Sequence, residues 1–157
     1  MNILYPMHRM LLHKMVEEGV DFILVGGYAV NYHGYNRVTG DMDIWVRPDN
    51  ETKKVLLSTL KKLEFDEEGL TELEGWDFTK PHLFHIGKEP DLTDFMTFIS
   101  GVNYAEVKQF AIQAHIEGVT VYIIHLKHLI QNKAASGRLK DLTDIEYLNK
   151  IFNLKKK

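Results

Sequence analysis

The sequence has no cysteine, which excludes a disulfide framework, a zinc–thiolate site and a cysteine nucleophile. It has no apolar run of about eighteen residues and no signal-peptide pattern, so we expect a cytoplasmic protein without a membrane span. An excess of basic residues is also missing. The net charge of −3 argues against a broad electrostatic grip on nucleic acid, which needs clustered lysine and arginine.

What remains is the composition of a globular protein, with 45% hydrophobic and 26% charged residues in a chain of 157. This length fits one domain. We therefore expect a single domain over residues 1–157, with C-terminal helices over 125–154 packed on it.

Hydrophobic periodicity predicts an α/β (α+β) fold, in which a mixed β-sheet is flanked by helices. Helical spacing marks 6–18, 27–33, 51–63, 125–135 and 141–152, and short apolar runs predict strands at 22–25, 42–46, 83–86, 92–98, 107–115 and 119–124. Asn50 is the expected cap of the third helix. In the last helix, the expected buried stripe is Leu142, Ile145, Leu148 and Phe152. The acidic stretch 64–80 lacks periodicity and is expected to be rich in loops.

Two carboxylates at the start of a predicted strand are the most informative feature. Asp41 and Asp43 are two residues apart, so in a strand they project to the same face. Like charges held this close raise each other's pKa unless a cation lies between them. Carboxylate oxygens suit Mg²⁺, and the pair therefore predicts a metal site. The alternative is a turn residue followed by a charge at the strand edge.

Upstream of this pair, an apolar run ends in Gly26-Gly27. Two glycines permit a tight turn, close approach of the backbone and a helix start with free N–H groups, which together suit a phosphate. A strand-to-helix turn without a ligand is the alternative. Beside the carboxylate pair, this turn predicts metal-dependent phosphoryl or nucleotidyl transfer.

The order Gly-Gly followed by Arg-x-Thr-x-Asp-x-Asp resembles the nucleotidyltransferase superfamily of DNA polymerase beta type. Within it, the chain is similar to the small bacterial AbiEii-like, or minimal nucleotidyltransferase, branch. The C-terminal stretch Gly-Arg-x-Lys-Asp at 137–141 also resembles this branch. The likeness extends from about residue 20 to 150.

The resemblance implies that Gly26 and Gly27 lie under a nucleoside triphosphate, and that a third carboxylate joins Asp41 and Asp43 in binding two Mg²⁺ ions. Asp94 is the expected third carboxylate. Its alternative is a solvent-facing residue on an edge strand. Asp91 reads as a turn residue after Pro90 and is the fallback.

Other charged and polar residues near these motifs are candidates for nucleotide binding. Arg37, which precedes Asp41 together with Thr39, could contact phosphate or base, orient Asp41, or lie exposed in a loop. Lys133 and Lys140 could neutralise phosphate charge, or each could be a solvated helix charge. We expect Gly26, Gly27, Arg37, Thr39 and Lys133 to form the nucleotide site.

These features favour a Mg²⁺-dependent nucleotidyltransferase that transfers NMP from an NTP to a hydroxyl acceptor. The acceptor is not specified: a protein, a tRNA end or a small molecule such as an aminoglycoside remains open. The resemblance implies a toxin–antitoxin or phage-defence setting with a cognate toxin or antitoxin as partner. The alternative is a non-catalytic relative that acts as an antitoxin or partner-binding module.

Overall fold

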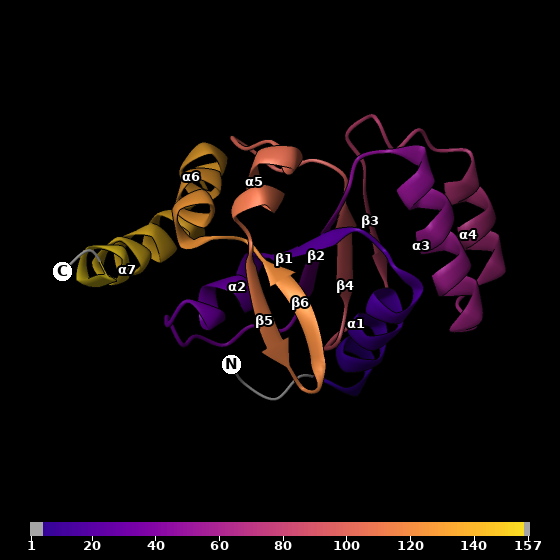
Figure 1. Ribbon diagram of the computed structural model, residues 1–157, viewed down its shortest axis with the longest axis horizontal. Coiled ribbons are helices and arrows are strands. Elements are labelled where there is room, and N and C mark those ends of the chain that lie inside the picture. The colour runs from indigo at the N-terminus through magenta and orange to yellow at the C-terminus, as the bar shows by residue number, and fades with distance from the viewer. Residues whose placement is uncertain (1–4, 156–157) are drawn as a thin grey trace.

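The computed structural model describes residues 5–155, which form a six-stranded mixed sheet with helices packed around it (Figure 1). The strand order is β3-β4-β2-β1-β6-β5. This architecture confirms the predicted fold class. The elements in chain order are α1 (Pro6–Glu18), β1 (Phe22–Val25), α2 (Gly26–Tyr32), β2 (Met42–Val46), α3 (Asn50–Lys62), α4 (Glu67–Glu74), β3 (Leu83–Ile86), β4 (Thr93–Met96), α5 (Tyr104–Phe110), β5 (Ile112–Ile116), β6 (Val119–Ile123), α6 (Leu126–Ser136) and α7 (Leu139–Lys155).

The first helix shows how local sequence sets an element. Pro6 begins α1, where its missing N–H would have no helical partner. Gly19 ends α1 with φ of 78°, a left-handed conformation that glycine adopts without a Cβ penalty. The buried face carries His8, Leu11, Leu12 and Met15, and the helix packs on α3 and β6.

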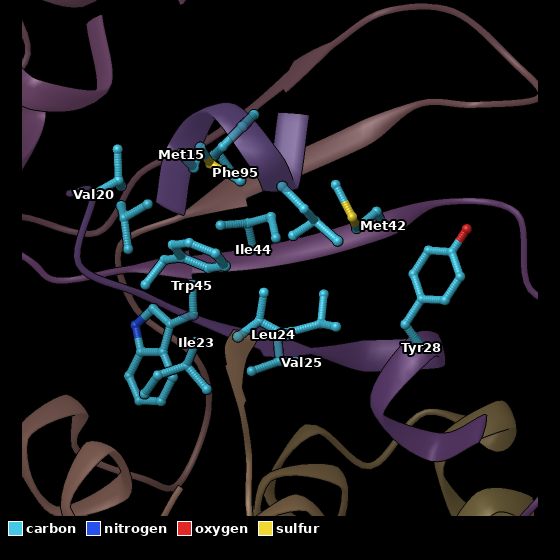
Figure 2. Packing of buried hydrophobic residues seen from close by; sticks show 14 of the residues in the cluster. Met15, Val20, Ile23, Leu24, Val25, Tyr28, Met42, Ile44, Trp45 and Phe95 are labelled. Atoms are coloured by element: carbon cyan, nitrogen blue, oxygen red, sulfur yellow. The ribbon is translucent and has the colours of Figure 1, made fainter. Parts of the chain in front are cut away.

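The two central strands of the sheet, β1 and β2, contribute buried residues to the core, and β2 also contains Asp43. All four residues of β1 are buried. In β2, Ile44 and Trp45 face opposite sides, and Figure 2 shows the Trp45 indole across the strand from Ile44 and Met42. The Trp45 indole N–H donates to the Thr97 carbonyl at 2.9 Å, so the buried ring leaves its polar atom satisfied. By alternation, Asp43 projects on the Trp45 side.

The structure corrects two predictions between residues 49 and 80. Asp49, not Asn50, caps α3, because its Oδ1 accepts from the Thr52 N–H at 2.7 Å. The stretch 64–80 was expected to be rich in loops, but it contains α4. Asp66 caps this helix, and the acidic residues Glu67 and Glu68 of its first turn interact favourably with the positive end of the helix dipole.

The C-terminal half holds three further corrections. The expected strand over 107–115 is wrong at its start, because Asn103 caps the helix α5 and the strand β5 begins only at Ile112. β4 is shorter than expected and spans Thr93–Met96. The predicted stripe of α7 is only partly right, since Leu148 is buried but Leu142 is 52% exposed.

Helices α3 and α4 lie at one end of the molecule, and α6 and α7 lie at the other (Figure 1). α7 packs mainly on α6, which in turn contacts α2. The two C-terminal helices therefore lie beside α2, with α6 in contact with it. Within residues 5–155, no helix is long and apolar enough to cross a membrane.

Candidate active site

The three candidate carboxylates lie on neighbouring segments of the sheet. β2 and β4 are parallel, and Asp43 is paired in register with Asp94. Asp41 comes two residues before Asp43, next to the first residue of β2. Asp94 lies on the half-buried face of β4, while its neighbours Thr93 and Phe95 are fully buried. The structure thus brings Asp41, Asp43 and Asp94 to the wall of one cavity.

Their electrostatics are those of an acidic cluster that nearby cations compensate only in part. Burial, followed by the charges of Asp94 and Asp41, raises the pKa of Asp43 to about 7, although Lys140 and Lys133 oppose the shift. Burial and the charge of Asp41 also raise the pKa of Asp94, against the influence of His85 and a hydrogen bond with Asp43. Positive charge brought between these carboxylates would lower both pKa values.

The two glycines are required by the side chains that pack on them. Gly26 has φ of 67°, and a Cβ there would overlap the Asp43 carboxylate. A Cβ on Gly27 would overlap the Thr39 hydroxyl. The turn between β1 and α2 therefore lies in contact with Asp43 and Thr39, and the glycines permit this close approach.

Two cavities meet at the carboxylates. The smaller has a volume of about 370 Å³, and its wall includes Gly27, Thr39, Asp41 and Lys140. The larger, of about 500 Å³, is lined partly by apolar side chains and partly by polar groups of α6. The residues common to both walls are Asp43, Asp94 and Arg138. The carboxylate pair thus lies at the boundary between a polar cavity and a half-apolar cleft.

Lys133 lines the larger cleft but is held in a buried ion-pair network. Its Nζ lies 2.9 Å from Asp144 Oδ2 and 3.4 Å from Asp141 Oδ1. Lys133 is 5% exposed, so the alternative of a solvated helix charge is wrong. The ammonium group has three N–H donors, and the two carboxylates use two of them. The third can serve a ligand in the cleft.

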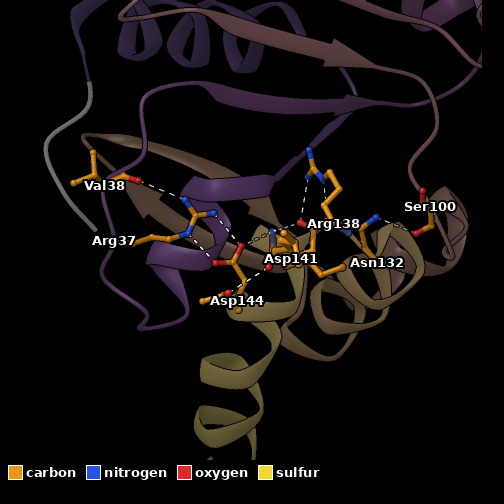
Figure 3. A network of polar contacts seen from close by, with 10 residues as sticks. Arg37, Val38, Ser100, Asn132, Arg138, Asp141 and Asp144 are labelled. Atoms are coloured by element: carbon orange, nitrogen blue, oxygen red, sulfur yellow. Dashed lines mark hydrogen bonds and ion pairs between the residues drawn. The ribbon is translucent and has the colours of Figure 1, made fainter.

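Arg37 belongs to the same network and not to either cavity wall. Its Nε and Nη2 donate to the two oxygens of Asp144, each at 3.0 Å (Figure 3). The structure therefore places Arg37 on Asp144 and not on Asp41. Its side chain is 15% exposed, so the alternative of an exposed loop arginine is wrong as well.

Arg138 completes the network on the cleft side. Its Nε and Nη2 donate to the carboxylate of Asp141 at 2.8 and 3.2 Å. Burial opposes ionisation of Asp141, but hydrogen bonds from Arg138 and Ser136 and the charge of Lys133 hold its pKa below the usual range. Asp141 thus stays charged and fixes a guanidinium at the boundary of the two cavities.

The donor set fits a divalent cation. In residues 5–155, no group of three or more histidine or acidic side chains is arranged to hold a metal ion by itself. Mg²⁺ does not need such a cage, because it is usually bound by one or two carboxylates together with water and substrate phosphates. Asp43 and Asp94 supply that number, and a cation bound between them would lower their raised pKa values.

The predicted site did not include His8, Asp141 or Asp144, although Asp141 ends the Gly-Arg-x-Lys-Asp stretch that carries the resemblance. Each is at most 1% exposed. His8 falls on the apolar face of a helix whose other buried members are leucine and methionine, which was the available signal. Asp141 and Asp144 occupy one face of α7 at a spacing of three residues, which on a helix places them side by side.

Comparison with known proteins also relates this chain to nucleotidyltransferases. The family model described as "Nucleotidyl transferase of unknown function (DUF2204)" matches residues 7–157. This match supports the predicted likeness to nucleotidyltransferases but does not extend to the AbiEii-like branch.

Solved structures share the fold. TM1012 from Thermotoga maritima, a protein assigned as a nucleotidyltransferase, is 15% identical with a TM-score of 0.58, over 97% of this chain and 96% of that chain. ANT(2'')-Ia in complex with adenylyl-2''-tobramycin is 13% identical with a TM-score of 0.57, over 96% and 90%. The solution structure of the same antibiotic-resistance factor is 14% identical with a TM-score of 0.51, over 94% of this chain and 90% of that chain. At these identities the likeness shows the fold alone.

Proposed function

The chain belongs to the nucleotidyl transferase family DUF2204, and from this premise we propose that it transfers a nucleoside monophosphate from an NTP to a hydroxyl acceptor in a Mg²⁺-dependent reaction. Asp41, Asp43 and Asp94 are the proposed ligands of two ions. The observation that carries the proposal is the in-register pair of Asp43 and Asp94 at the boundary of two cavities.

The smaller cavity suits a triphosphate. Its wall combines the turn at Gly27, the hydroxyl of Thr39 and the cations Arg138 and Lys140 with the carboxylates. Phosphate oxygens accept hydrogen bonds from such groups, and the cations offset their charge. Lys133, with its third N–H, is proposed to contact phosphate from the other side of Asp43.

Bound at the carboxylates, Mg²⁺ would supply Lewis acidity toward the phosphate oxygens and the attacking hydroxyl. Asp94 accepts the proton of that hydroxyl, whose oxygen forms the new bond to the α-phosphorus. The bond from this phosphorus to the bridging oxygen breaks, and pyrophosphate leaves. Arg138 and Lys140 stabilise the charge that develops on the departing phosphates.

In-line displacement also constrains the direction from which the acceptor hydroxyl approaches the α-phosphorus. If pyrophosphate leaves into the polar cavity, the hydroxyl approaches from the opposite direction, and the proposed route is the larger cleft, whose wall shares Asp43, Asp94 and Arg138 with that cavity. The cleft's described acidic lining residues are Asp43 and Asp94, which the ions would occupy. Its other walls include Leu83, Met96 and Phe98. This lining favours an acceptor with an uncharged, partly apolar body over a polycation such as an aminoglycoside.

The biological setting is a further part of the proposal and depends on the sequence resemblance alone. A cytoplasmic toxin–antitoxin or phage-defence system, with a cognate toxin or antitoxin as partner, is the setting that the resemblance favours. A protein hydroxyl, which can lie on a largely uncharged surface, is then the acceptor to test first, and a tRNA end, which carries phosphate charge, is the second.

The experiment is a transfer assay with each of four α-labelled NTPs, with and without Mg²⁺, on purified tRNA, tobramycin and cell lysate. We expect label transfer from the wild type only with Mg²⁺. Asp43→Asn should abolish it, because the charge that holds the ion is lost. Glu72→Gln, an acid-to-amide change on the exposed side of α4, is the matched control and should keep full activity.

Absence of transfer with every NTP and acceptor class would count against the enzyme. If Asp43→Asn and the wild type then bound a partner protein equally well, the non-catalytic module would replace the proposal. Equal transfer by Asp43→Asn and the wild type would show that the carboxylate assignment is wrong even though the activity exists.

A further inference from the structure

We propose that His8 is a positioning residue that holds the segment leading into Asp94 against the helix that begins at the glycine turn. The inference depends on the proposed function, because it concerns the same site. His8 is on α1, which contributes no residue to either cavity wall among the residues described here. It would act through the backbone and through Tyr28, without touching substrate or metal.

The hydrogen bonds of His8 reach two distant segments. Nε2 lies 2.9 Å from the Asp91 carbonyl oxygen and 3.0 Å from that of Leu92. Nδ1 lies 2.8 Å from the hydroxyl oxygen of Tyr28. Carbonyl oxygens only accept, so Nε2 carries the proton and Nδ1 accepts from the Tyr28 O–H. The imidazole is fully buried, and both of its nitrogens are satisfied.

The first of these segments leads directly into β4. Leu92 is two residues before Asp94, and its carbonyl oxygen also accepts from the Met42 N–H at 3.0 Å. Met42 lies between Asp41 and Asp43. One carbonyl group therefore joins the start of β2 to the start of β4, and His8 donates to that same carbonyl.

The second segment is α2. Tyr28 follows Gly27 in the chain and is 3% exposed. Its ring meets the His8 ring edge-on, with centroids 5.5 Å apart. Through the hydroxyl and the ring contact, His8 fixes the helix that begins at the glycine turn. His8 thus contacts α2 and the start of β4 directly, and it reaches the Asp41–Asp43 segment through the Leu92 carbonyl.

Simple core filling would not need this arrangement. Leucine at position 8 would bury more apolar surface without a polar group to satisfy. The retained imidazole instead specifies the distance between α2 and residues 91–92, which are 83 and 84 positions away from it along the chain. Groups that orient metal ligands affect metal affinity strongly although they do not bind the ion.

The test compares His8→Leu, His8→Gln and Leu12→Ala by the MgCl₂ concentration that gives half of the maximal rise in Tm, without nucleotide. Leu12 is equally buried on the same helix, and its truncation destabilises the fold without removing a polar link. We expect His8→Leu to raise the half-saturating MgCl₂ about tenfold or more. Leu12→Ala should leave it unchanged despite a lower Tm.

His8→Gln is the rescue variant, because its amide nitrogen can still donate to the carbonyls of residues 91 and 92. It should restore most of the wild-type Mg²⁺ response. If His8→Leu does not fold, Tyr28→Phe tests the other link, and a several-fold weaker Mg²⁺ response is expected. In an active preparation, the loss should fall on kcat more than on KM for the NTP.

An unchanged half-saturating MgCl₂ in His8→Leu, or in Tyr28→Phe should the former not fold, would overturn the inference while leaving the proposed function intact. The same holds if Leu12→Ala weakens the response equally, since the effect would then follow stability alone. A wild type without any Mg²⁺ response would instead refute the metal site, and the role of His8 would fall with it.

Discussion

Replacement of Gly26 by alanine separates backbone strain from disruption of the site. Gly26 has φ of 67°, and the new Cβ would overlap the Asp43 carboxylate. The left-handed conformation costs a non-glycine residue about 1–2 kcal/mol. Asp43 would also have to leave its rotamer, which costs about 1 kcal/mol more. We therefore expect Gly26→Ala to lower the free energy of unfolding by about 2–3 kcal/mol.

Gly19 provides the matched control. It has a comparable φ of 78°, but a Cβ there would meet nothing within 4 Å. Gly19→Ala should therefore show the backbone strain alone, about 1–2 kcal/mol. The measurement is urea unfolding of both variants, with and without Mg²⁺. Mg²⁺ at about 100 times its Kd should stabilise the wild type by about 2.7 kcal/mol.

The decisive comparison is the Mg²⁺ response. Gly19→Ala should keep it, because the carboxylates are untouched. Gly26→Ala should lose most of it, because Asp43 is displaced from its place opposite Asp94. If Gly26→Ala were no less stable than Gly19→Ala and kept the full Mg²⁺ response, the close packing of Asp43 on the turn would not matter for metal binding.

Three further predictions concern Lys133, Asp141 and Gly27. Lys133→Met should destabilise the fold by about 3–5 kcal/mol in thermal or urea unfolding, because it removes one partner from a buried ion-pair network. Lys140→Met on the exposed start of α7 should be nearly neutral. Asp141→Asn should cost stability at pH 7 and progressively less as pH falls below the ordinary pKa of 3.8, because the folded-state pKa is lowered; a loss that is constant from pH 7 to pH 2 would contradict this. Gly27→Val should weaken NTP binding in a fluorescence titration, because its side chain would displace the Thr39 hydroxyl from the smaller cavity, and unchanged binding would place the triphosphate elsewhere.

The parts of the fold that were predicted well are those determined by local chemistry. Pro6 and Gly19 bound α1 at the residues expected, because proline at a helix start and glycine at its end act within one turn. The spacing of Asp41 and Asp43 likewise placed them together at the start of β2. Asp94 was expected as the third carboxylate from the family resemblance, and its register with Asp43 is a property of the sheet that no local pattern reports.

The parts that failed depend on contacts between distant residues. Arg37 pairs with Asp144, which is 107 residues away, and no local pattern reports such a partner. The predicted strand over 107–115 overlaps the helix α5 at residues 107–110, and Tyr104 and Val107 of this helix are buried at helical spacing. In this segment, the Asn103 cap and the packing of one face outweigh β propensity.

The buried charges between α2 and α7 are better explained by position than by stability. Replacing a buried ion pair by apolar residues of similar volume is often neutral or stabilising, so stability alone does not account for Arg37, Lys133, Asp141 and Asp144. The network runs from the loop ahead of Asp41 to Arg138 (Figure 3). It fixes two cations beside the acidic pair, and Lys133 partly offsets the raised pKa of Asp43. If the site binds metal and triphosphate as proposed, it needs cations that stay in place while these ligands bind and leave. Ion pairs with the buried carboxylates of Asp141 and Asp144 hold them there, and the lowered pKa of Asp141 keeps that acid charged at neutral pH.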